Sequence, residues 1–102
     1  MLWNVPNVNA EPEIILDFWQ ICKSNENTYH FAGYHGGAGR CSSPIMQFDL
    51  LELAGVTRSG RKYRLYKDGR GFNMNAAACA GDWFRLNKLT YEVVNPEEVK
   101  FN

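Results

Sequence analysis

The sequence has no long apolar run, only three cysteines and no net charge, and each of these absences excludes a class of protein. No stretch approaches the roughly 18 apolar residues that span a membrane, and the first residues lack the cationic start and apolar core of a signal peptide. Three widely spaced cysteines, Cys22, Cys41 and Cys79, do not make a disulfide framework. We therefore expect free thiols in a cytoplasmic protein.

The zero net charge argues against a strongly acidic nucleic-acid mimic. It also argues against a basic protein that coats nucleic acid, because such binding needs many phosphate contacts. The charge is nevertheless unevenly distributed: residues 40–72 carry seven basic and three acidic side chains, residues 1–39 sum to −3, and residues 73–102 sum to −1. The middle segment is therefore the electropositive one.

The length of 102 residues predicts a single small domain, residues 1–102. Hydrophobic residues make up 45% and charged residues 22%, both ordinary for a folded globular protein. The aromatic fraction of 14% is generous. It supplies bulky side chains for a small core and could leave some for a binding surface.

Short runs of β-branched and aromatic residues between turn residues predict most of the sheet. The strands expected in this way are Tyr29–Tyr34, Pro44–Asp49, Leu50–Thr57 and Thr90–Val94. Residues 1–10 are expected to form an extended arm or a short edge strand. The glycine-rich segment His35–Gly39 is expected to be a flexible loop.

Two helical segments are expected toward the end of the chain. Three consecutive alanines predict a helix at Asn75–Leu86, with Asn73 or Asn75 as its N-cap. Pro96–Glu98 predicts a polar tail or one helical turn.

Residues 11–23 fit two patterns. A helix is favoured by the spacing of five side chains, Ile14, Ile15, Phe18, Ile21 and Cys22. A strand is favoured by the alternation of Ile14, Leu16 and Phe18 and by the density of β-branched and aromatic residues. We favour the helix, and the predicted fold class is α+β, a small antiparallel sheet with one or two packed helices. A strand here would make the protein nearly all-β, with a small barrel as the alternative.

The segment Gly55–Tyr66, GVTRSGRKYRLY, predicts a β-hairpin. If Ser59 and Gly60 form a two-residue turn, Val56 pairs with Tyr63 and Ala54 with Leu65. Those pairs would form a buried apolar face. The opposite face would be basic and partly aromatic, with Leu53, Gly55, Thr57, Lys62, Arg64 and Tyr66.

This hairpin supplies the candidate partner-binding residues, which are Arg58, Arg61, Lys62, Arg64 and Tyr66. Arginine and tyrosine are enriched at protein–protein hot spots, so the face could bind an acidic protein surface. The same residues could contact phosphates and stack a base. A third interpretation is that the charges only keep an exposed strand soluble and protect it from edge pairing.

Other candidate sites have ordinary explanations. The glycine-rich loop lacks the Gly-Lys-Ser/Thr that follows in a phosphate-binding loop. His30, His35 and Cys41 lack the tight spacing of a zinc site, and Cys41 with His35 matches no nucleophile motif. Asp49 suits a turn better than a catalytic carboxylate pair with Glu52. We therefore expect no metal, no cofactor and no enzymatic activity.

The segments Ser43–Ile45, Phe48–Asp49 and Thr57–Leu65 resemble a group of small phage and bacterial mobile-element proteins without an established activity. The resemblance covers about half of the chain and rests on a strand, a T-R-S-G-R-x-Y-x-L hairpin and a following helix with aromatic residues. Members often continue with a Gly-Pro turn, where this chain has Lys67-Asp68-Gly69. The resemblance implies no activity that could be assigned residue by residue.

Small non-enzymatic phage proteins often bind and block a bacterial machine, including CRISPR-type defence nucleases. The resemblance thus implies a binding protein in the cytoplasm of a bacterial host. We expect it to inhibit or modulate a host protein or ribonucleoprotein complex through the hairpin. A nucleic-acid-binding module that uses the same residues is the alternative.

Overall fold

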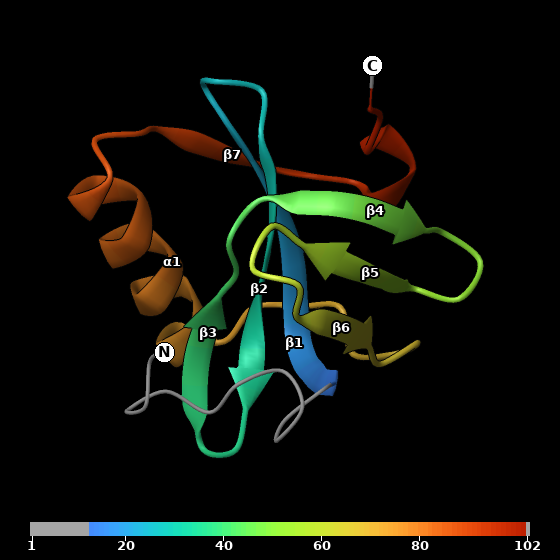
Figure 1. The fold of residues 1–102 in the computed structure, drawn as a ribbon. Coiled ribbons are helices and arrows are strands. Elements are labelled where there is room, and N and C mark those ends of the chain that lie inside the picture. The colour runs from blue at the N-terminus through green and yellow to red at the C-terminus, as the bar shows by residue number, and fades with distance from the viewer. Residues whose placement is uncertain (1–12, 102) are drawn as a thin grey trace, which may run out of the picture.

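The computed structural model describes residues 13–101 as one mixed sheet with a single α-helix packed on it (Figure 1). The expected arm at residues 1–10 lies outside the described residues. The elements in chain order are β1 (Glu13–Ser24), β2 (Tyr29–His35), β3 (Ala38–Cys41), β4 (Ile45–Asp49), β5 (Ala54–Thr57), β6 (Lys62–Leu65), α1 (Met74–Leu86), β7 (Tyr91–Val94) and the 3₁₀ turn η1 (Pro96–Glu98).

The predicted α+β class is confirmed, and the sheet is open. Its strand order is β3-β2-β1-β6-β5-β4, with β7 also paired to β1. Within the described residues β3 and β4 do not pair with each other, so the strands do not close into a barrel. Among the helices that the structure describes, none has the length and apolar character needed to cross a bilayer.

The central strand is β1, where we expected a helix. Its first half, Glu13–Leu16, pairs in parallel with β6, and its second half pairs antiparallel with β2 on one edge and with β7 on the other. Ile14 and Leu16 are fully buried, whereas Ile15 and Phe18, which a helix would have buried, are 38% and 44% exposed. The helix prediction is wrong because strand partners on both edges satisfy the backbone of this segment.

Two hydrophobic cores lie on opposite faces of the sheet. The larger core gathers side chains from β1, β2, β4, β6 and β7, with Phe31 and Trp19 among its largest members. The smaller core lies under α1, where Phe84 and Ala80 pack on Cys22 and Ala32. As predicted, Asn73 caps this helix, and its side chain accepts a hydrogen bond from the Ala76 N–H at 3.0 Å.

The glycine-rich segment is a tight turn rather than the flexible loop we expected. His35 pairs with Ala38, so only Gly36 and Gly37 connect β2 to β3. Both glycines have positive φ, 60° and 83°, which a two-residue turn of this kind requires. The predicted strands at Tyr29–Tyr34, Pro44–Asp49 and Thr90–Val94 and the helical turn at Pro96–Glu98 are confirmed within one or two residues.

The β5–β6 hairpin forms as predicted, but its register is shifted by one residue. Val56 pairs with Lys62 and Gly55 with Tyr63, and the Thr57 N–H donates to the Arg61 carbonyl oxygen at 3.0 Å. The loop therefore has three residues, and Gly60 takes the left-handed conformation (φ 88°) that closes such a loop. The shift turns β5 over, so that Gly55 and Thr57 are buried while Ala54 and Val56 face outward.

Candidate interaction face

The register of four strands builds one exposed face, which we call the outer face. One cross-strand row contains Glu13, Lys62, Val56 and Gln47, and the next contains Ile15, Arg64, Ala54 and Asp49. Each residue points to the same side because positions two apart on a strand share a face. The outer face is thus a small-residue floor, Ala54 and Val56, between charged and polar side chains.

A shallow depression of about 380 Å³ lies over this floor. Lys62 and Arg64 on β6 border it on one side, and Gln47 and Asp49 on β4 border it on the other. Helix α1 packs over β1, β2 and β3 instead. No described element therefore covers the outer face.

Charges of both signs alternate across the outer face. Arg64 Nε lies 3.4 Å from Glu13 Oε2, and Arg64 Nη1 lies 3.9 Å from Glu52 Oε1. All three side chains are substantially exposed, so these ion pairs contribute little to stability. They place the guanidinium group of Arg64 between two carboxylates and beside Lys62.

The structure divides the predicted partner-binding residues into two groups. Lys62 and Arg64 share the outer face, and Tyr66 follows just beyond β6 with 54% of its surface exposed. Arg58 lies in the turn at the far end of the hairpin, where its N–H donates to the Pro44 carbonyl oxygen. Arg61 is partly buried, and strand alternation turns it away from Lys62.

Several residues of the outer face were missed by the sequence analysis. Glu13 and Ile15 come from β1, which we expected to be helical, and Ala54 and Val56 were expected in the core. Little in the sequence indicated the register shift, because Gly60 can close a three-residue loop and can equally serve as the second residue of a two-residue loop.

Neither a catalytic pair nor a metal site forms at His35 and Cys41. Cys41 pairs with Ala32, three positions before His35 on β2, so the two side chains point to opposite faces. Burial raises the pKa of the Cys41 thiol, which keeps it protonated and unreactive. No group of three or more potential ligands in the described part of the chain could hold a metal ion.

His30 is fully buried, and both of its ring nitrogens have hydrogen-bond partners. Nδ1 lies 2.9 Å from the Ser42 carbonyl oxygen, and Nε2 lies 2.8 Å from Thr28 Oγ1. A carbonyl oxygen only accepts, so Nδ1 carries the proton and Nε2 accepts from Thr28. His30 is therefore a structural residue with no nitrogen left for a metal ion.

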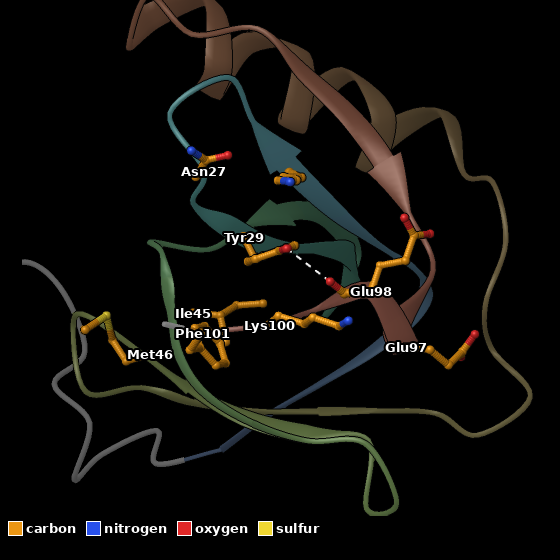
Figure 2. Close-up of a pocket in the computed structure, with 9 residues that line it drawn as sticks. Asn27, Tyr29, Ile45, Met46, Glu97, Glu98, Lys100 and Phe101 are labelled. Carbon is orange, nitrogen blue, oxygen red and sulfur yellow. Dashed lines mark hydrogen bonds between the residues drawn. The ribbon is translucent and has the colours of Figure 1, made fainter.

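A second depression, of about 780 Å³, lies between the β1–β2 turn, β4 and the C-terminal segment (Figure 2). The Tyr29 hydroxyl donates to the Glu98 carbonyl oxygen at 3.0 Å, and the Tyr29 ring meets Phe101 edge to face. The Glu98 carboxylate accepts from the Asn95 N–H. The two Tyr29 contacts fasten the C-terminal segment to β2.

No family model matches the chain, and no curated protein or solved structure matches it at a significant level. The outer face must therefore be interpreted from its own chemistry.

Proposed function

We propose that this chain is a non-enzymatic binding protein that modulates a bacterial host protein complex through the outer face. The observation that carries the proposal is the position of Arg64 between Glu13 and Glu52, beside Lys62, on a sheet face that no described element covers. Arginine is among the residues that are enriched at protein–protein hot spots. The small-residue floor admits side chains of a partner between the two charged borders.

The alternating charges favour a protein partner over nucleic acid. Glu13, Asp49 and Glu52 lie among the basic residues, and each carboxylate would repel a phosphate backbone. A protein surface can present complementary groups of both signs, and such complementarity gives specificity. The same pattern suits a partner with its own alternating charges.

The bacterial setting of the proposal comes from the resemblance of the Thr57–Leu65 hairpin to phage and mobile-element proteins. In that setting the partner is a cytoplasmic host complex. A defence nuclease of the CRISPR type is one class that such proteins inhibit.

A nucleic-acid-binding module is the second candidate, and one observation favours it. Residues 40–72 carry a net charge of +4, and Tyr66 is half exposed next to Arg64 and Lys67, where it could stack on a base. This candidate predicts binding that weakens steeply as salt rises.

The test is affinity capture from a bacterial lysate with and without nuclease treatment, read by mass spectrometry. The wild type is compared with Lys62→Ala/Arg64→Ala and with Lys88→Ala/Lys100→Ala, which removes two positive charges away from the outer face. We expect a discrete host protein to be captured by the wild type and the control variant and lost by the outer-face variant. Capture that disappears with nuclease would favour the nucleic-acid candidate, and equal capture by all three proteins would refute a role for the outer face.

A further inference from the structure

The connection between β4 and β5 exposes two leucines at its tip. Leu51 is 93% exposed and Leu50 is 43% exposed. Figure 1 shows this connection projecting from the body of the sheet. Single exposed apolar residues are common on protein surfaces. Two adjacent exposed leucines can act as a binding element when the backbone that carries them is held in one conformation.

Three contacts fix the backbone of this tip, residues 50–53. The Glu52 N–H donates to Asp49 Oδ1 at 3.1 Å, and the Leu65 N–H donates to the Leu53 carbonyl oxygen at 2.8 Å. The Leu53 side chain packs against the larger core. Leu50 and Leu51 therefore lie between two anchored ends.

Leu53 adopts a positive φ of 51°, which is unfavourable for a residue with a branched side chain. Such a conformation persists only where the surroundings enforce it, and it is concentrated at functional sites. Here the strained residue is the one that turns the chain from the exposed leucines back into β5. The strained residue therefore lies directly beside the segment that exposes Leu50 and Leu51.

The tip is continuous with the outer face. Ala54, the first residue of β5, pairs with Arg64, and Arg64 also forms the ion pair with Glu52. Ile15, 38% exposed, lies beside Arg64 in the same row. A partner that covers Arg64 can therefore reach the leucines without a second, separate contact.

We infer that Leu50 and Leu51 form the apolar anchor of the interaction and insert into an apolar pocket on the protein partner. The inference rests on the proposed function, which it deepens. Because Asp49 and Glu52 flank the leucines, the complementary pocket has a cationic rim. The same two carboxylates oppose insertion into an anionic membrane surface. A preformed tip loses little conformational entropy on binding, which is why a rigid anchor increases affinity.

The inference is tested with a photoreactive side chain placed at position 51 and, as a control, at position 86, since Leu86 is 75% exposed at the end of α1. Both proteins are irradiated in nuclease-treated bacterial lysate. We expect position 51 to cross-link to the same host protein that the wild type captures, and position 86 not to do so. Cross-linking of position 51 only to a second copy of the chain, or to nothing, would overturn the inference.

Affinity measurements on the captured partner supply the second test. We expect Leu50→Ser/Leu51→Ser to bind at least tenfold more weakly and Leu86→Ser to bind like the wild type. Circular dichroism checks that each variant is folded. Unchanged affinity of the tip variant would refute the anchor. Binding of the wild type to vesicles of phosphatidylglycerol and phosphatidylethanolamine, lost in the tip variant, would refute the choice of a protein pocket.

The two proposals fail in different ways. Loss of the partner by Lys62→Ala/Arg64→Ala with full binding by the tip variant retains the proposed function and removes the anchor. Loss of the partner by the tip variant with full binding by Lys62→Ala/Arg64→Ala retains the anchor and removes the outer face from the proposed function. A wild type that captures no host protein would refute both.

Discussion

The ring of Phe31 on β2 lies against Gly55 on β5. This contact brings the two strands together in the larger core. A Cβ atom at position 55 would lie 2.8 Å from Phe31 Cζ and 2.5 Å from the Gln47 carbonyl oxygen. Real Cβ atoms do not approach other heavy atoms so closely. Glycine is thus required here by the close approach of a neighbouring strand and a ring, and not by a turn.

Gly55→Ala is expected to destabilise the protein by about 2–3 kcal/mol, because the backbone of β4 cannot move away from the new methyl group without breaking its pairing. Gly81→Ala is the matched control, since a Cβ there meets nothing within 4 Å and lies inside α1. The control should gain up to about 1 kcal/mol from higher helix propensity. Urea denaturation of the two variants measures both effects. A neutral Gly55→Ala would mean that β5 does not pack as described.

The strand character of β1 could not be predicted from its pattern of hydrophobic residues. Ile21 and Cys22 are both buried although adjacent, because the larger core lies on one face of β1 and α1 on the other. A bulge between Asp17 and Gln20 also shifts the phase of the alternation. Burial on both faces and a shifted phase remove the two-residue period, so the spacing of the apolar residues resembles that of a helix.

The β5–β6 hairpin was predictable, but its register was not. Its strands and turn residues are encoded locally, whereas loops of two and of three residues both fit Arg58-Ser59-Gly60. The choice depends on the contact between Gly55 and Phe31, which are distant in the sequence. A slip of one residue reverses every side chain of a strand. The sequence therefore predicted Lys62 and Arg64 on the outer face, but it did not predict Ala54 and Val56 between them and β4.

His30 is expected to make the protein less stable in acid. Burial lowers the pKa of the His30 imidazole, an effect partly opposed by its hydrogen bond to the Ser42 carbonyl oxygen and reinforced by the charge of Arg58. A base whose pKa is lower in the folded state contributes stability above its unfolded value of about 6.5 and loses it as the pH falls below that value.

Urea denaturation at pH 7 and pH 5 tests this expectation. The wild type should lose more stability between the two values than His30→Gln does, because the variant has no imidazole at position 30. The pH difference within each protein is the relevant quantity, since the variant will also lose packing against Phe84. Equal losses in the two proteins would show that another group causes the acid sensitivity.

Cys22 is expected to make the protein less stable at alkaline pH. Burial raises the pKa of the Cys22 thiol to about 12. The thiol is harder to ionise in the folded protein than in the unfolded chain, where its pKa is about 8.5. Its contribution to stability is therefore fully present below about pH 8.5 and is lost as the pH rises toward 12.

Between pH 8 and pH 10 this thiol should lower the free energy of unfolding by about 2 kcal/mol. Cys22→Ala should remove that part of the decline, and urea titrations of both proteins at the two pH values measure it. The decline will not vanish, because burial also raises the pKa of the Cys41 thiol. A variant that declines as steeply as the wild type would assign the alkaline sensitivity to other groups.

Helix α1 ends in a Schellman motif whose key position holds a lysine. The Leu89 N–H donates to the Phe84 carbonyl oxygen at 2.9 Å, and the Lys88 N–H donates to the Arg85 carbonyl oxygen at 3.0 Å. Lys88 has a positive φ of 58°, where this motif usually has glycine. Leu89 packs into the smaller core and keeps the chain in this conformation despite the cost.

Lys88→Gly is expected to stabilise the protein by about 1 kcal/mol, because the left-handed conformation costs a residue with a Cβ about 1–2 kcal/mol and the greater freedom of unfolded glycine offsets part of the gain. The midpoint of thermal unfolding should rise by roughly 4 °C for a domain of this size. Lys88→Ala is the matched control, since it removes the same charge and keeps the Cβ. The glycine variant must therefore exceed the alanine variant in stability, and equal midpoints would mean that the hydrogen bonds at the end of α1 do not depend on the conformation of residue 88.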